Sequence, residues 1–182
     1  MIASLAMTLK RIVLICAVMC SMDATYAQTL KKYPIDASGC SIYMFCNPGK
    51  FDVSMSPDSS KVYSGECVLD SVYYDVICVK MKERIADLAG AEDLLVQYLD
   101  YLKSSFRVTG AAGYGKGHRL KGKETTSGIV DYWQDEGKNN IKVKGWTDGT
   151  YIAVAMVITA KEIPESKANV FLDGIVFPEI KK

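Results

Sequence analysis

The sequence contains one histidine, His118, among its 182 residues. One histidine, with no carboxylates clustered at ligand spacing, argues against zinc and calcium sites. A serine or cysteine nucleophile would have to use His118 as its base, and no G-x-S-x-G motif presents a serine. The sequence therefore predicts no catalytic residue, no metal site and no cofactor, and an enzyme is the less favoured class.

The chain also lacks a surplus of charge. Removal of residues 1–27 takes away two basic and one acidic side chain, which leaves 20 of each sign with the histidine neutral. Nucleic acid requires a basic surplus that neutralises phosphates, and anionic lipid attracts clusters of basic residues. We therefore expect neither nucleic acid nor an anionic membrane surface as a partner.

Long apolar runs are missing, apart from one run of nine residues at 12–20. Two basic residues precede this run, and the small residues Thr25 and Ala27 follow it in the −3 and −1 positions of a cleavage site. This order is typical of a secretory signal peptide, and nine residues are too few for the roughly 20 that span a bilayer. We expect a signal peptide at 1–27, a mature chain from Gln28 without a membrane anchor, and a periplasmic or extracellular location.

Four cysteines remain after export: Cys40, Cys46, Cys67 and Cys78. None has C-x-x-C spacing, so neither a thioredoxin-type site nor a zinc knuckle is indicated. An even number in an exported chain favours disulfides. Pairing between sequence neighbours, Cys40–Cys46 and Cys67–Cys78, is one prediction, and burial of some cysteines as free thiols is the alternative.

Residues 28–39 are interpreted as a flexible N-terminal tail, followed by a single domain at 40–182. Apolar side chains alternate in four segments, which are expected to be strands at 41–46, 51–56, 62–69 and 74–81. After Gly90 the apolar spacing becomes helical and predicts a helix at about 91–106 that packs on a sheet.

The C-terminal half predicts a meander of strands. A glycine-rich connector at 110–117 leads to strands at 128–134, 140–146 and 146–160, and Asp148-Gly149 is a hairpin signal. Pro164 suits the first turn of a short closing helix that Gly174 ends. The predicted fold class is α+β: a mainly antiparallel sheet flanked by one long amphipathic helix and a short C-terminal helix.

A two-residue loop at Asp148-Gly149 predicts which side chains share a sheet face. Alternate apolar residues of the two flanking strands form a core face: Ile141, Val143, Ile152, Val154, Met156 and Ile158. The opposite face is expected to hold Trp133, Trp146 and Tyr151 beside Asp131, Lys142, Lys144, Ala153, Ala155 and Val157. These aromatic residues could form a platform for a sugar or a protein. The small Ala153 and Ala155 favour the alternative, in which a helix covers the tryptophans.

Two segments resemble the PsbP-like fold, a helix/sheet/helix sandwich of photosystem lumenal proteins and small bacterial secreted proteins. They are Phe51-Asp52-Val53-Ser54-Met55-Ser56-Pro57 and Val170-Phe171-Leu172-Asp173-Gly174-Ile175-Val176-Phe177. The resemblance covers about residues 50–177, and cystatin-like or NTF2-like sheets are the rival folds. It implies a mostly non-catalytic protein that docks onto other proteins.

The segment Gly113–Arg119 is the remaining candidate site. It combines glycines with Tyr114, Lys116, His118 and Arg119, and Lys121 and Lys123 follow, so it could bind an anion or a glycan. Phosphate loops, however, follow a strand and open a helix, whereas this segment follows the predicted helix. A flexible connector with a solvated basic edge is the favoured interpretation.

Three functions follow as hypotheses. The first is an exported non-enzymatic binding or accessory protein that docks to a protein or envelope component through a patch with Trp133, Trp146 or Tyr114. The second is an enzyme that acts on a cell-envelope substrate through His118 and a nearby acid or thiol. The third is a carrier of a small apolar ligand, which needs a cavity between the helix at 91–106 and the sheet.

Overall fold

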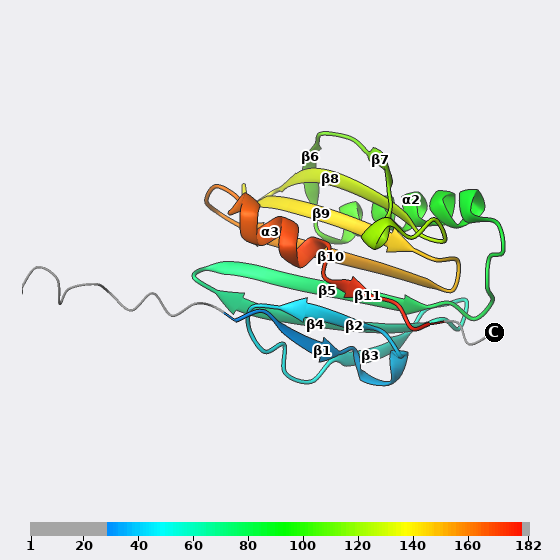
Figure 1. The fold of residues 1–182 in the computed structure, drawn as a ribbon. Helices are drawn as coiled ribbons and strands as arrows, with labels where there is room; N and C mark the ends of the chain where they lie inside the picture. The colour runs from blue at the N-terminus through cyan, green and yellow to red at the C-terminus, as the bar shows by residue number, and fades with distance from the viewer. Residues whose placement is uncertain (1–28, 180–182) are drawn as a thin grey trace, which may run out of the picture.

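An antiparallel sheet of eight strands is the centre of the fold in the computed structural model (Figure 1). The structure describes residues 29–179, so the predicted signal peptide lies outside the described residues. The strand order is β3-β4-β5-β10-β9-β8-β6, with β7 paired to β8. The strands are β3 (Asp52–Met55), β4 (Lys61–Leu69), β5 (Val72–Lys80), β6 (Val108–Ala111), β7 (Gly115–His118), β8 (Ser127–Asp135), β9 (Asn140–Thr147) and β10 (Tyr151–Thr159).

Two α-helices lie on opposite faces of this sheet (Figure 1). Helix α2 (Leu88–Ser105) begins after Asp87, whose carboxylate accepts the N–H groups of Ala89 and Gly90. Its buried leucines pack on β8 and β9, where Gly145 leaves room for Leu95. Helix α3 (Glu165–Leu172) packs on β9 and β10 from the other side. The predicted α+β class, with a mainly antiparallel sheet and one long and one short helix, is confirmed.

A three-stranded sheet lies on the α3 side and contains the start and the end of the described chain (Figure 1). It consists of β1 (Lys31–Pro34), β2 (Ser41–Met44) and β11 (Ile175–Val176). A 3₁₀ turn, η1 (Asp36–Ser38), joins the first two strands, and Ile35 before it is fully buried. The prediction of a tail at 28–39 is therefore wrong, because this segment pairs with β2 and contributes to the core.

The two faces of β9 and β10 follow the predicted alternation, although the register differs. Ile152 pairs with Thr147 and Ala153 with Trp146, so the loop holds four residues instead of two. A shift of two residues keeps every side chain on its face. The predicted core face therefore lies under α2, while Ala153, Ala155 and Trp146 face α3 as expected for a helix that crosses the sheet.

The hairpin between β8 and β9 overturns one predicted face. Trp133 pairs with Ile141 and Gln134 with Asn140, and Lys138 in the connection has a φ of 65°. This arrangement is typical of a three-residue loop with a left-handed residue before the second strand. Because directly paired residues share a face, Asp131 and Trp133 lie on the α2 side with Val143 and Ile141, away from Lys142, Lys144 and Trp146.

The glycine-rich segment at 110–117 is also different from the expected connector. Gly110 lies in β6 and Gly115 and Gly117 lie in β7, and both strands pair with β8 at the edge of the sheet, while Gly113 lies between them. The bulge between Val108 and Gly110 and a second irregularity between Gly115 and His118 accommodate the glycines.

A disulfide joins Cys46 to Cys67, so the predicted pairing between sequence neighbours is wrong. The alternative of buried free thiols applies to the other two cysteines, Cys40 and Cys78. The disulfide links the segment after β2 to β4 and thereby ties the small sheet to the large one. No helix among residues 29–179 combines the length and apolar composition that crossing a bilayer requires.

We expect Gly128→Ala to destabilise the protein by about 1 to 3 kcal/mol. A Cβ atom at Gly128 would lie 2.2 Å from Cζ3 of Trp146, which is buried against α3. Urea unfolding followed by circular dichroism measures the change. Gly110→Ala is the matched control, because no atom lies within 4 Å of its Cβ position. Equal stability of the two variants would contradict the packing described here.

Candidate functional site

The two tryptophans do not form a binding platform. Trp133 lies under α2 and Trp146 under α3, and both are buried. The indole N–H of Trp146 donates to the carbonyl oxygen of Leu172 at 2.8 Å. Tyr151, on the Trp146 face, is also buried, and its hydroxyl donates to the carbonyl oxygen of Ser38. The alternative interpretation, that the tryptophans pack under helices, is therefore correct.

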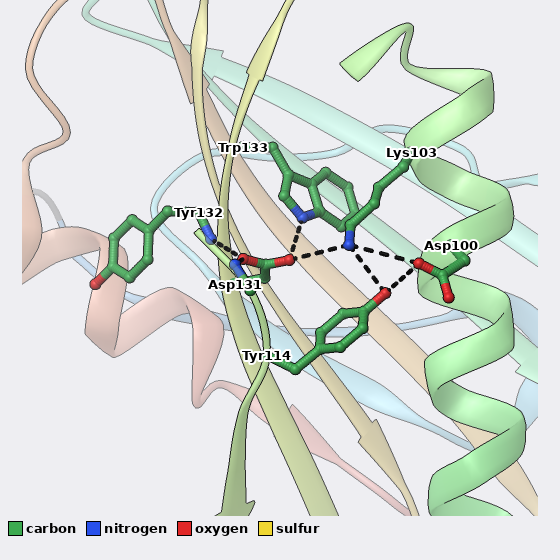
Figure 2. Close-up of polar contacts among 7 residues, drawn as sticks. Asp100, Lys103, Tyr114, Asp131, Tyr132 and Trp133 are labelled. Atoms are coloured by element: carbon green, nitrogen blue, oxygen red, sulfur yellow. Dashed lines mark hydrogen bonds and ion pairs between the residues drawn. The ribbon is translucent and has the colours of Figure 1, made fainter. Parts of the chain in front are cut away.

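Asp131 organises a polar cluster beside Trp133 (Figure 2). Its side chain is fully buried, and its carboxylate accepts three N–H groups: those of Gly113, Tyr132 and the Trp133 indole, at 2.9, 2.8 and 2.7 Å. The ammonium of Lys103, from α2, lies 3.3 Å from the same carboxylate. This buried charge is thus both paired and hydrogen-bonded, as a low-dielectric site requires.

Tyr114 and Asp100 complete the cluster (Figure 2). Lys103 donates to the Tyr114 hydroxyl at 3.0 Å, and this hydroxyl donates to Asp100. Burial opposes the charge on Lys103, but the hydrogen bonds to Tyr114 and Asp131 outweigh it and raise the pKa of the amine. The cluster links α2 to β8 and to the β6–β7 connection. Its charged groups form ion pairs and hydrogen bonds with one another.

The other residues of the predicted basic segment are dispersed. Lys116 pairs with Glu92 at 3.4 Å, and Arg119 pairs with Glu124 at 3.6 Å. Burial and the charge of Lys144 lower the pKa of His118. Its imidazole makes no hydrogen bond or ion pair with another residue in the range 29–179, so no nucleophile–base pair forms there. Among these described residues, no group of three or more His, Cys, Asp or Glu side chains is arranged to hold a metal ion.

Lys142 and Lys144 hold α3 on the sheet. Lys142 donates to Glu165 and to Asn169, and Lys144 contacts Asp173 at 2.7 Å. The Lys144 ammonium also lies 4.5 Å from the centre of the Trp146 ring. Both lysines are therefore part of the helix–sheet contact.

A cavity of about 480 Å³ lies on the α3 side, between the segment after β7 and the C-terminal strand β11. Its apolar lining comes from five residues: Leu120, Ile175, Val176, Phe177 and Pro178. Thr125 and Thr126 contribute hydroxyl groups. This volume and this composition are typical of small-molecule sites.

Three basic residues, Arg84, Lys121 and Lys123, also line the cavity, together with the carboxylates of Asp148 and Glu179. None of the three basic residues forms an ion pair with a carboxylate in the part of the chain that the structure describes. Asp148, in contrast, accepts the backbone N–H groups of Thr150 and Tyr151 at 2.8 and 2.9 Å. The unpaired charges at the cavity are therefore mainly positive.

Local hydrogen bonds fix the turn that carries Lys121 and Lys123. This turn contains a short 3₁₀ segment, η2 (Leu120–Gly122). The buried hydroxyl of Thr126 accepts the Leu120 N–H at 2.9 Å and donates to the Lys123 carbonyl at 2.8 Å. Lys121 adopts a φ of 50°, and its ammonium lies 5.4 Å from the Tyr43 ring centre.

Gly149 positions the segment that contributes Arg84. The Ile85 N–H donates to the Gly149 carbonyl at 2.8 Å. Gly149 has a φ of 82°, and a Cβ atom there would lie 2.2 Å from the Ile85 carbonyl oxygen. The predicted Asp-Gly turn therefore serves a second purpose, since only glycine permits this close contact.

The carrier hypothesis requires an apolar cavity between α2 and the sheet. The groove found there has a volume of about 250 Å³ and is smaller than the cavity at β11. Tyr98 and Tyr101 of α2 line it together with Val62 and Val79. The larger cavity lies on the opposite face, because β11 and the turn after β7 meet there.

A pair of carboxylates lies at another cavity, of about 260 Å³. Asp75 of β5 pairs in register with Glu66 of β4, and Oδ1 of Asp75 is buried without a hydrogen-bond partner among the described residues. Burial and the neighbouring charge of Glu66 raise the pKa of Asp75 from 3.8 to about 7. Asp75 therefore titrates near neutral pH.

No protein-family model and no curated protein matches this sequence. The resemblance to PsbP-like proteins therefore stays a prediction that depends on packing patterns at 51–57 and 170–177. The case for a function depends on the geometry of the cavities and clusters above.

Sequence reasoning missed most of the residues at the large cavity. It noted Lys121 and Lys123 as part of a basic edge, but Arg84 and the apolar residues at 175–178 carried no signal of a site. Asp75 was also missed, although a carboxylate within the apolar strand Val72–Lys80 is a detectable anomaly.

We expect Asp131→Ala to destabilise the protein by about 3 to 5 kcal/mol, because it leaves a partly buried ammonium and a buried indole N–H without their acceptor. Chemical unfolding measures this loss. Asp100→Ala removes an exposed partner of the same lysine and should cost less than about 1 kcal/mol. A comparable loss for both variants would show that burial of the carboxylate is not the decisive factor.

The raised pKa of Asp75 predicts a pH-dependent stability. The folded protein holds this proton up to about pH 7, whereas the unfolded chain releases it near pH 3.8. Stability therefore falls as the pH rises from about 4 to 7. Asp75→Asn should remove this decrease and stabilise the protein at pH 8 by roughly 2 to 4 kcal/mol.

Unfolding free energies at several pH values test this prediction. Asp52→Asn is the control, since Asp52 lines the same cavity but is exposed on β3. A decrease that persists in Asp75→Asn, or that disappears in Asp52→Asn, would assign the effect to another group.

Proposed function

We propose that this protein is an exported, non-enzymatic binding protein that takes an amphipathic ligand with an apolar body and an anionic head. The ligand enters the cavity between the turn at 120–126 and β11. Such a ligand is an envelope or extracellular component of the fatty-acid or acyl-phosphate type. The cavity, with its apolar lining and three basic residues, is the observation that carries the proposal.

The apolar part of the proposal depends on the residues that form the cavity wall. Phe177 stacks on Tyr151, with ring centres 5.9 Å apart, and Leu120 is buried. These contacts hold the wall in place before a ligand arrives. A preformed apolar cavity favours binding because little conformational entropy is lost on association.

The anionic part depends on the three basic residues. Arg84, Lys121 and Lys123 come from two separate segments, and both segments are held by backbone hydrogen bonds. Burial of an alkyl chain beneath them would place a carboxylate or phosphate within their reach. Charged hydrogen bonds of this kind orient a ligand and contribute modestly to affinity at an exposed rim.

Export rests on the predicted signal peptide at 1–27, which the disulfide Cys46–Cys67 supports, since disulfides persist in oxidising compartments. The enzyme hypothesis has less support, because His118 has no hydrogen-bonded nucleophile among residues 29–179. The platform for protein docking also has less support, because Trp133 and Trp146 are buried.

Calorimetric titration of the chain from Gln28 with laurate, dodecanol and dodecyltrimethylammonium tests the proposal. We expect laurate to bind most tightly, dodecanol more weakly and the cation least. Lys121→Gln/Lys123→Gln should weaken laurate binding about tenfold, which corresponds to about 1.4 kcal/mol, and should change dodecanol binding little. Val176→Glu places a carboxylate in the apolar lining and should abolish binding of both.

Lys138→Gln/Lys161→Gln is the matched control. It removes the same charge at the opposite end of the β-hairpins and should leave every affinity unchanged. Equal weakening by the two double variants would contradict the assignment of the anionic head to Lys121 and Lys123. Failure of all three probes to bind would contradict the proposed function itself.

A further inference from the structure

Helix α2 covers only part of its face of the large sheet. It packs on β6, β8 and β9, whereas β3, β4 and β5 lie toward the other edge (Figure 1). A helix with its side chains is about 10 to 12 Å wide and strands are spaced by about 4.8 Å, so one helix covers roughly two strands. The α2 side of β4 and β5 is therefore beyond the reach of this helix.

The burial of β4 and β5 differs between their two faces. On the α3 side, these two strands contribute five buried residues to the core. On the α2 side, Val62 and Ile77 are only partly buried, and the paired Val68 and Tyr73 are 50% and 45% exposed. Exposed apolar side chains that gather on one face are typical of an interaction surface.

Two hollows follow the flank of α2 along this open face. Leu94 of α2 and Val79 of β5 line the groove of about 250 Å³. Phe106, at the C-terminal end of α2, and Ile77, the next residue on the same face of β5, line the cavity of about 260 Å³. The two hollows are therefore continuous and form one trough, the α2 trough. From Leu94 to Phe106 it is about 18 Å long, or roughly three helical turns.

Carboxylates lie at both ends of the α2 trough. Asp52, Glu66 and Asp75 line the cavity at one end, and Asp58 lines the groove at the other. None of these four carboxylates forms an ion pair with a basic residue in the range 29–179. Lys50 is the only basic residue among those that line the two hollows in the described part of the chain. The α2 trough thus combines an apolar floor with mainly negative ends.

We propose that the α2 trough binds an amphipathic helix of a partner protein that carries lysine or arginine at both ends of its apolar stripe. The stripe would cover Val62 and Ile77, and the basic residues would pair with Asp58 at one end and with Asp52 and Glu66 at the other. Helix-in-groove binding of this kind uses apolar residues at i, i+3, i+4 and i+7. The proposal does not depend on the ligand of the cavity at β11, which lies on the opposite face.

The dimensions of the trough favour a helix as the occupant. Packed helices have axes about 8 to 10 Å apart, so a second helix beside α2 would lie over β4 and β5. Tyr98 and Tyr101 stack on the flank of α2, with ring centres 6.1 Å apart, and Tyr101 is 64% exposed. These two rings would contact the second helix.

The charge of the trough decides between a basic helix and other occupants. A two-fold contact with a second copy of the chain would place two acidic troughs against each other. An anionic membrane surface would be repelled for the same reason. Complementary charge, in contrast, orients a basic helix and accelerates its association.

Fluorescence anisotropy of a labelled peptide, titrated with the chain from Gln28, tests the proposal. The probe is an amphipathic peptide of leucine and lysine with about 14 residues, which span roughly 21 Å as a helix. One reference peptide has glutamate in place of lysine, and the other has the same leucines and lysines in scrambled order. We expect the probe to bind at least about tenfold more tightly than either reference, which corresponds to about 1.4 kcal/mol.

Tyr101→Lys introduces a positive charge at an exposed position of the trough and should weaken probe binding about tenfold. Val170→Lys is the matched control, because it adds the same charge at an exposed apolar position of α3 and should leave the affinity unchanged.

Asp52→Asn/Glu66→Gln removes two exposed carboxylates and should weaken probe binding about fivefold. Its control is Glu162→Gln/Glu179→Gln, which removes the same charge from residues that line other cavities. Failure of the probe to bind, or equal effects of the trough variants and their controls, would overturn the proposal. A wild-type dimer in analytical ultracentrifugation that Tyr101→Lys dissociates would assign the trough to a second copy and would also overturn it.

Discussion

Burial of β10 on both faces is the constraint on which the rest of the structure depends. Every residue of β10 except Ile158 is buried, and the strand pairs with β5 on one side and β9 on the other. Ile152, Val154 and Met156 form the side that α2 helps to cover, whereas the small Ala153 and Ala155 allow α3 to approach closely. A strand that is covered on both faces must carry apolar side chains on both faces, and β10 does.

The polar clusters occur where the two helices meet the sheet. The Asp131–Lys103 pair connects α2 to β8, and the lysines of β9 connect α3 through Glu165 and Asp173. Each helix thus combines an apolar contact with charged partners that fix its position. These charges hold elements together, whereas Arg84, Lys121 and Lys123, which form no ion pair among the described residues, line the cavity at β11.

Much of the fold could be predicted from local sequence patterns. The alternation of β9 and β10 gave the correct faces even though the loop between them is two residues longer than expected. In the preceding hairpin, the pairing of Trp133 with Ile141 and of Asp131 with Val143 places both residues on the α2 side, opposite to the predicted face. Loop length depends on backbone conformation at single residues such as Lys138, and composition does not reveal it.

The sequence by itself determined the α+β class, the long helix, the meander and the core faces of β9 and β10. These features follow from the periods of the strand and the helix, which are properties of neighbouring residues. Only the tertiary structure decided the partner of Cys46 and the cavity that combines Arg84, the turn at 120–126 and residues 175–179. These features depend on which distant segments pack together, and that choice is made by the whole core.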